Sequence, residues 1–287
     1  MLNESLNFLT RHSKKFKENK GLEESREYPG LTMEGVRLAR ETSADKLKPM
    51  IDKLPEKAVM AIIGASDAIR TKSTAQIYGD ELKKQYHGSE NVIIKTKEEI
   101  LPSKAQEDLP LDRRAIEELK KEIEQNPDKK FVLDFPLFIK EFSMKGRWVD
   151  KDGNLSLYCQ KLLGAVNNDD DQAVIKWVET DGEIDGIKGP KPLEVARLYK
   201  QGFERLKKFV ETQISDRPVF IGGVGHSWDL DVFIAYMTHN KIDEKALKDI
   251  MGENAEMIQE TEEFYFNIED GKIKGRYRDQ DYEIPLN

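Results

Sequence analysis

The sequence predicts an α/β protein in which helices cover both faces of a mainly parallel central sheet, a three-layer α/β/α architecture. AVMAIIGAS at 58–66 is a continuous apolar run with the length and composition of a strand buried in a parallel sheet, and a second apolar strand starts at Pro218, before a Gly-rich turn. Segments with helical periodicity stand between and after these runs. Strands that alternate with helices along a chain indicate parallel pairing, because each crossover helix returns the chain to the same edge.

The first hundred residues supply the beginning of this alternation. LNFLT at 6–10 and NVIIK at 91–95 are short apolar runs on either side of the strand at 58–66. A polar loop and a helix with Thr32 as its N-cap join the first two strands, and the next helix is expected to start near Ser66. The order is therefore strand, helix, strand, helix, strand.

The second half of the chain is less uniform. We interpret residues 101–190, which hold a helix from about Asp112 and the strand candidate KFVLDF, as an insertion or cap over the core. The apolar strand that starts at Pro218 leads into a Gly-rich turn, and Ser227 is the expected N-cap of the helix that follows. The runs EFYFNI and IKGRYR around EDGK predict a C-terminal hairpin. We expect residues 1–287 to form one domain that includes the insertion.

The composition limits the class of protein. The chain is 38% hydrophobic, which is sufficient for a buried core, and 35% charged, which gives a well-hydrated surface. Its net charge of −8 gives no basic footprint for nucleic acid, and no run approaches the roughly 18 apolar residues of a membrane span. The single cysteine, Cys159, fits a reducing compartment. We therefore expect a cytoplasmic protein with no nucleic-acid partner and no membrane partner.

Chemically active side chains stand at the ends of three predicted strands. Arg11 and His12 end the first strand, Arg70 lies one helical turn beyond Ser66 at the end of the second, and His226 stands at the end of the strand that starts at Pro218. The carboxyl ends of parallel strands lie along one edge of a sheet, so these groups are expected to converge. Guanidinium groups match phosphate oxygens in a bidentate way, and a neutral imidazole is a nucleophile for phosphorus. The set therefore predicts a phosphate site.

Four segments together resemble the histidine phosphatase (phosphoglycerate mutase-like) superfamily. They are TRHS, YPGLTMEGVRLA, SDAIRTKSTA and GVGHS, which follow the family pattern of R-H-G, L-T-x-x-G-x-x-x-A, S-x-x-x-R-x-x-x-T-A and a late G-H or S-H in order and spacing. The resemblance covers about residues 6–95 and 190–240. It implies the phosphoglycerate mutase-like form of the three-layer fold.

The resemblance also implies roles for individual residues. His12 would be the nucleophile that forms a phosphohistidine, while Arg11, Arg70 and His226 would bind the phosphoryl group and stabilise its transition state. Ser13 replaces the usual glycine after the first histidine, and its hydroxyl is a candidate hydrogen-bond donor to phosphate. The lysines that follow it are expected to attract an anionic substrate despite the net charge.

The proton donor for the leaving group is a separate question. In mutase-like members of the family a carboxylic acid follows the third strand, which here points to Glu99 or, next to it, Glu98. In the acid-phosphatase branch an aspartate directly follows the late histidine, and Ser227 occupies that position here, which leaves Asp229 as a weaker substitute. Glu99 is our predicted acid.

These residues predict a phosphomonoester hydrolase that acts through a phosphohistidine on a phosphorylated small molecule or a phosphoprotein. The alternatives are a phosphoglycerate-type mutase and a non-catalytic phospho-ligand binding module on the same fold. The chain has no H-E-x-x-H or paired-cysteine motif, and GGVG lacks the Lys-Ser/Thr of a P-loop. We therefore expect a metal-independent enzyme without a cofactor.

Overall fold

The computed structural model describes residues 6–17, 21–100, 113–135, 139–269 and 272–285. Its main feature is a sheet with the strand order β10-β9-β8-β1-β7-β2-β4-β3. The strands of this sheet are β1 (Asn7–Arg11), β2 (Val59–Gly64), β3 (Val92–Lys95), β4 (Lys130–Asp134), β7 (Val219–Gly225), β8 (Glu263–Glu269), β9 (Lys272–Tyr277) and β10 (Gln280–Pro285). A separate small ribbon pairs β5 (Glu183–Ile184) with β6 (Ile187–Lys188).

The sheet is parallel in its centre and antiparallel at one end. Strands β1, β7, β2, β4 and β3 pair in parallel, whereas β8 runs antiparallel to β1 and leads into β9 and β10. The predicted mainly parallel sheet and C-terminal hairpin are confirmed, and β10 adds one further strand to the hairpin. Strand β4 lies between β2 and β3, so residues 101–190 include one strand of the central sheet.

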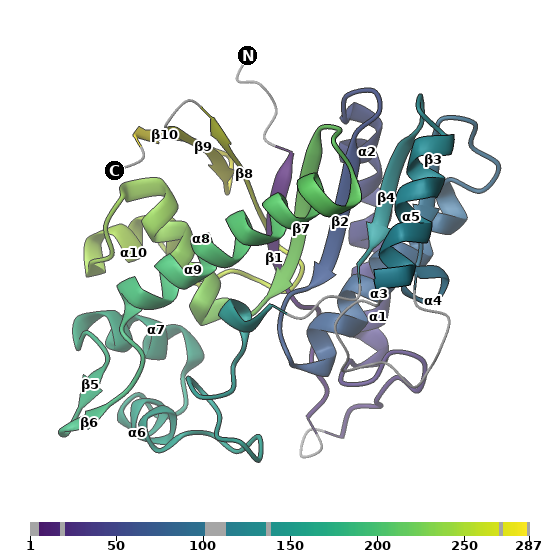
Figure 1. The fold of residues 1–287 in the computed structure, drawn as a ribbon. Coiled ribbons are helices and arrows are strands. Elements are labelled where there is room, and N and C mark those ends of the chain that lie inside the picture. Colours follow the sequence, from purple (N-terminus) through teal and green to yellow (C-terminus); the bar gives the residue numbers. More distant parts are fainter. Residues whose placement is uncertain (1–5, 18–20, 101–112, 136–138, 270–271, 286–287) are drawn as a thin grey trace.

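Helices cover both faces of the sheet, as the three-layer prediction requires (Figure 1). The helices are α1 (Met33–Thr42), the π-helix η2 (Ser43–Leu47), α2 (Lys48–Lys53), α3 (Ile69–Gln85), α4 (Lys97–Ile100), α5 (Arg113–Gln125), the 3₁₀-helix η4 (Lys140–Phe142), α6 (Leu157–Ala165), α7 (Asp170–Glu179), α8 (Pro192–Phe209), the π-helix η5 (Val210–Ile214), α9 (Ser227–His239) and α10 (Glu244–Met251). In the described parts of the chain, none of them is long and apolar enough to cross a bilayer.

Strand β2 shows how the two layers are built. Its alternate side chains point to opposite faces, as the pleat of a strand requires. Met60 and Ile62 join a core cluster with α1, α2 and α3, whereas Ala61 and Ile63 join a second cluster with α5, α8, α9 and α10. A continuous apolar run was therefore the correct indication of a strand that is buried on both faces.

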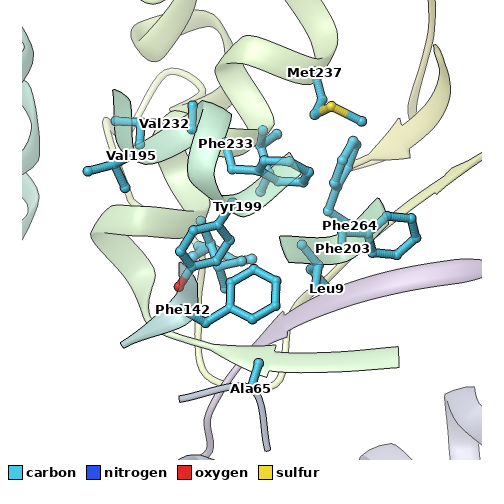
Figure 2. Close-up of a cluster of buried hydrophobic side chains, with 14 of the residues drawn as sticks. Leu9, Ala65, Phe142, Val195, Tyr199, Phe203, Val232, Phe233, Met237 and Phe264 are labelled. Atoms are coloured by element: carbon cyan, nitrogen blue, oxygen red, sulfur yellow. The ribbon is translucent and has the colours of Figure 1, made fainter. Parts of the chain in front are cut away.

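The second cluster holds the largest aromatic packing of the protein core (Figure 2). Phe142 and Tyr199 meet edge to face with ring centroids 4.4 Å apart, and Phe264 packs beside Phe233 with centroids 6.2 Å apart. Leu9 of β1 and Ala65 lie at the sheet side of the same cluster. This packing fixes the carboxyl ends of β1, β2 and β7 relative to helices α8 and α9.

The glycines of GGVG lie in strand β7, where the sequence predicted a turn. A Cβ on Gly222 would meet the ring of Phe8 at 2.3 Å, and one on Gly223 would meet Leu9 at 2.4 Å. The two glycines therefore leave space for the side chains of the neighbouring strand β1 on opposite faces of the sheet. This close approach is the reason for glycine at positions that a β-branched residue normally fills.

Helices α6 and α7 and the β5–β6 ribbon form a lobe below the main body in Figure 1. The lobe shares the core of the protein, because Trp148 meets Trp177 of α7 and Trp228 of α9 edge to face with centroids 4.7 and 4.9 Å apart. The backbone carbonyl of Asp170 also accepts a hydrogen bond from Trp228 Nε1 at 3.2 Å. These contacts hold α7 beside the helix that starts directly after His226.

Candidate active site

The register of three parallel strands brings the predicted residues to one edge of the sheet. Arg11 lies opposite Gly225, and the backbone N–H of His12 donates to the carbonyl of Gly225 at 3.0 Å. On the other side of β7, the N–H of Ala65 donates to the carbonyl of Val224 at 3.0 Å. The register therefore places His12 beside His226, and the segment from Ala65 to α3 lies on the other side of His226. This is the arrangement that the four motifs imply.

The hydrogen bonds of His12 define its tautomer. Its Nδ1 lies 2.7 Å from the carbonyl oxygen of Ser13, and its Nε2 lies 3.0 Å from Nε of Arg70. A carbonyl only accepts and a guanidinium only donates, so Nδ1 carries the proton and Nε2 presents its lone pair. The ring is therefore neutral, with its free nitrogen on the side of Arg70.

His226 completes a compact group with the same arginine. Nη2 of Arg70 donates to its Nδ1 at 3.2 Å, and its Nε2 lies 2.7 Å from Oγ of Ser66. The rings of His12 and His226 are 5.3 Å apart between centroids. Arg70 thus bridges both histidines, and the tautomer of His226 has its proton on Nε2.

Burial explains the charge state of both rings. His12 is 4% exposed and His226 is 6% exposed. Burial, followed by the nearby charge of Arg70, lowers the pKa of each histidine well below its usual value. Desolvation disfavours the imidazolium form, and the guanidinium adds repulsion to it. Both rings are consequently neutral at pH 7.

Two further cations stand at this edge. Arg11 is held by the carbonyl of Ile258 at 2.8 Å and by Glu260 at 3.5 Å. Lys15 lies close enough to add positive potential at both histidines, and burial followed by the charge of Lys17 lowers the pKa of Lys15 to about 8. The result is a concentration of positive charge in a protein with a net charge of −8. Such a local field attracts an anion in spite of the overall charge.

The second and third motifs have a local structural role. Oγ1 of Thr32 caps α1 by accepting from the N–H of Gly35 at 3.0 Å, and a Cβ on Gly35 would meet the carbonyl oxygen of Lys14 at 2.5 Å. Oγ1 of Thr74 accepts from the N–H of Ser13 at 3.1 Å and donates to the carbonyl of Arg70 at 2.8 Å. These residues fix the loop after His12 against α1 and α3.

The structure directs Ser13 away from the predicted phosphate site. Its side chain is fully buried, and its hydroxyl donates to the carbonyl of Gly35 at 2.7 Å. The hydroxyl therefore attaches the loop to α1, and the contribution of Ser13 to the candidate site is its backbone carbonyl, which orients His12. From the sequence we expected this hydroxyl to be a donor to phosphate, whereas in the structure it donates to the carbonyl of Gly35.

Residues 143–148, which we call the strap, were missed by the sequence analysis. Sδ of Met144 accepts from Nη2 of Arg70 at 3.1 Å, and the N–H of Met144 donates to Oδ1 of Asp67 at 3.0 Å. The other end of the strap is attached to Asp229, which accepts from Arg147 Nη2 at 2.8 Å and from Trp148 Nε1 at 2.7 Å. Both oxygens of Asp229 are thus engaged in holding the strap.

Glu99 lies outside this group of side chains. Its Oε2 accepts from the N–H and the hydroxyl of Thr96 at 2.9 and 3.1 Å, and it pairs with Lys83 at 2.8 Å. Lys83 is near the far end of α3, about 20 Å of helix axis from Arg70. Strand β4 separates β3 from β2 and displaces the loop after β3 from the histidines. The structure therefore does not bring the predicted acid to the other predicted residues.

The ionisation of Glu99 agrees with a capping role. Burial acts to raise the pKa of this carboxyl, but the hydrogen bonds from Lys83 and Thr96 outweigh it and hold the pKa below its usual value. A general acid needs a proton at working pH, so a lowered pKa disfavours that use. Glu98 is the partner of Gln76, whose Nε2 donates to it at 3.2 Å on the surface of α3.

If the protein hydrolyses phosphate monoesters, as the sequence predicts, we expect Glu99→Gln to leave that turnover within about twofold of the wild type. It should reduce the free energy of unfolding by about 1 kcal/mol, because the helix cap and the Lys83 pair are weakened. Steady-state kinetics and thermal denaturation of the variant, with Glu98→Gln as the matched control, measure the two effects. A loss of turnover above about a hundredfold, the scale of a general acid, would restore Glu99 as the proton donor.

The described residues contain no group of three or more histidine, cysteine, aspartate or glutamate side chains placed to hold a metal ion. The arrangement that is present consists of two neutral imidazoles and fixed cations. Such a set is chemically suited to bind a phosphoryl group, whose transfer is catalysed mostly by positioning and charge stabilisation.

No protein-family model and no curated protein matches the chain. Among solved structures, the chain is similar to the α-ribazole phosphatase from Shigella flexneri, with 14% identity, 95% of each chain covered and a TM-score of 0.43. It is also similar to a mycobacterial glucosyl-3-phosphoglycerate phosphatase, with 12% identity, 97% of this chain and 95% of the other covered and a TM-score of 0.45. For YhfR from Bacillus stearothermophilus the identity is 9%, the coverage 95% and 96%, and the TM-score 0.47.

Proposed function

We propose that the protein is a phosphomonoester hydrolase of the histidine phosphatase type, which acts through a phosphohistidine on His12. The observation that carries the proposal is the tautomer of His12. Its proton is committed to the carbonyl of Ser13, so the lone pair of Nε2 is available on the side where Arg70 and His226 stand. A neutral imidazole in this orientation is the form that attacks phosphorus.

The donors of Arg70 support the binding step. In the structure they are used by three neutral acceptors, which are His12 Nε2, His226 Nδ1 and Met144 Sδ. Phosphoryl oxygens are stronger acceptors for a guanidinium because the hydrogen bond is charge-assisted. A phosphate monoester that enters the site therefore takes these donors and releases the lone pair of His12 for attack.

The following steps use the same groups. Nε2 of His12 forms a bond to phosphorus in line with the breaking P–O bond, and the alcohol oxygen leaves with the electron pair and takes its proton from solvent water. The positive charge that forms on the ring is stabilised by the Nδ1–H bond to the carbonyl of Ser13. Arg11 and Arg70 balance the charge on the phosphoryl oxygens during the transfer. Water then attacks the phosphohistidine, which releases inorganic phosphate and regenerates the neutral ring.

Hydrolysis of para-nitrophenyl phosphate in the presence of EDTA tests this function. The pKa of His12 is lowered mainly by burial, so the neutral nucleophile persists as the pH falls through 6.5 and is lost only below that. We expect kcat/KM for the dianionic substrate to stay constant between pH 7.5 and 6. A histidine with an ordinary pKa would lose about fourfold over this interval.

Two results would contradict the proposal. The first is an absence of turnover in EDTA that a divalent metal ion restores, because the proposed chemistry needs no metal. The second is a fall of kcat/KM that follows an ordinary histidine titration, because it would mean that the reacting base is not the buried ring of His12.

A further inference from the structure

The contact between Met144 and Arg70 has no role in the proposed hydrolysis. A thioether sulfur is a weak acceptor, yet Sδ of Met144 lies 3.1 Å from Nη2 of the arginine that bridges both histidines. The contact occupies a donor that a phosphoryl oxygen needs. Any change in the acceptor strength of this sulfur therefore changes the competition for Arg70.

Met144 also differs from most methionines of the protein in its accessibility. Five others are buried at 6% exposure or less: Met50, Met60, Met237, Met251 and Met257. In the described part of the chain only Met33, which is 53% exposed on α1, and the partly exposed Met144 are open to solvent. A small oxidant in solution thus reaches one methionine on the surface and one at the candidate site.

We propose that Met144 is an oxidation site, and that its conversion to the sulfoxide by hydrogen peroxide weakens phosphate binding at Arg70. The inference rests on the proposed function, because it takes the Arg70 group as the phosphate site. The sulfoxide oxygen is a strong hydrogen-bond acceptor, whereas the thioether is not. It would hold the Nη2 donor of Arg70 in the place of a phosphoryl oxygen.

Hydrogen peroxide is the sole oxidant that the conversion of Met144 to the sulfoxide requires. The O–O bond of hydrogen peroxide breaks, one oxygen forms the S–O bond of the sulfoxide, and the other leaves as water. The sulfur loses two electrons and the peroxide gains them, so no additional co-reactant is needed. Methionine sulfoxide is returned to the thioether by methionine sulfoxide reductases, so the change is reversible.

The strap keeps the sulfoxide in place. The backbone of Met144 is attached to Asp67 on one side, and Arg147 and Trp148 are attached to the buried Asp229 on the other. These bonds hold the backbone of the strap, and with it the start of the Met144 side chain, beside Arg70. The new oxygen stays within reach of Arg70, and phosphate has to displace it.

The single cysteine is not a competing target. Cys159 is 2% exposed, and burial followed by the charge of Asp170 raises the pKa of its thiol to about 11. The thiolate is the form that peroxide oxidises, and it is scarce at neutral pH under these conditions. Effects of mild peroxide treatment are thus assigned to methionine.

The test measures binding of inorganic phosphate by isothermal titration calorimetry before and after treatment with hydrogen peroxide. Peptide mass spectrometry identifies the oxidised methionines in the same samples. We expect the wild type and Met33→Leu to bind phosphate about threefold to tenfold more weakly after oxidation, which is the scale of one hydrogen bond. Met144→Leu, which keeps the volume of the side chain, should bind phosphate equally before and after treatment.

A second variant makes the result independent of the oxidation chemistry. Met144→Gln places a carbonyl oxygen near the position of the sulfoxide oxygen, and it should show the weaker binding without peroxide. Equal losses in Met144→Leu and the wild type, or wild-type affinity in Met144→Gln, would overturn the proposal. If the untreated wild type does not bind phosphate, both this inference and the proposed function are overturned. If it binds phosphate with the same affinity before and after oxidation, the inference alone is overturned.

Discussion

His12→Ala is expected to lower the turnover of phosphate monoesters by about 10⁴-fold or more, the scale seen when an enzyme loses its nucleophile. The reason is that Nε2 of His12 presents its lone pair toward Arg70 while its Nδ1–H is held by the backbone carbonyl of Ser13, which stabilises the ring when it becomes positive. His226 is the poorer nucleophile, because its protonated Nε2 faces the hydroxyl of Ser66 and has no such carbonyl. Steady-state hydrolysis of para-nitrophenyl phosphate measures the loss.

A second readout separates a missing nucleophile from a damaged fold. Acid-quenched wild-type enzyme should carry phosphate on the peptide that contains His12, and the variant should carry none. His239→Ala is the matched control, because this histidine ends α9 in a surface pair with Asp249 at 2.9 Å. It should keep full turnover. Equal turnover by His12→Ala and the wild type would exclude the phosphohistidine mechanism.

The central part of the fold and four residues of the candidate site could be predicted from the sequence because the information is local. A buried run such as residues 58–66 indicates a strand by its composition, and the carboxyl ends of parallel strands share an edge whatever their order. Arg11 ends such a strand, His12 and His226 each directly follow one, and Arg70 lies in the first turn of the helix after β2. Their convergence therefore needs no knowledge of the complete topology.

The remaining features depend on the order of strands, which local patterns do not contain. KFVLDF was recognised as a strand candidate, but its insertion as β4 between β2 and β3 was not. That insertion moves the loop after β3, and Glu99 with it, away from the histidines. The strap was also missed, because an irregular segment has no periodicity and its contacts with Arg70 and Asp229 span more than 70 residues.

Ser13 illustrates a third kind of difference between sequence and structure. Its position next to His12 suggested a ligand for phosphate, but the direction of a short side chain depends on the nearest unpaired acceptor. Here that acceptor is the carbonyl of Gly35, because the absence of a side chain at Gly35 lets α1 approach the loop closely. A motif therefore fixes which residues are neighbours more reliably than which atoms meet.

Asp229→Ala is expected to have the largest effect on stability, a loss of about 3–5 kcal/mol in the free energy of unfolding. Asp229 is fully buried and accepts from both Arg147 and Trp148. Its removal leaves a guanidinium that is only 12% exposed without its counter-charge, and an indole N–H without an acceptor. Thermal and urea denaturation measure the loss, and the midpoint temperature should fall on the order of 10 °C.

Asp229→Asn distinguishes the charge from the hydrogen bonds. The amide oxygen can still accept from Trp148, whereas the counter-charge for Arg147 is gone, so the loss should be roughly half as large. Asp249→Ala, in an exposed pair, is the control and should change stability by less than about 1 kcal/mol. Wild-type stability of Asp229→Ala would mean that the strap is held by its aromatic packing alone. Asp229→Ala could also bind phosphate more tightly while it is less stable. That result would indicate that release of the strap removes Met144 as a competitor for the Nη2 donor of Arg70.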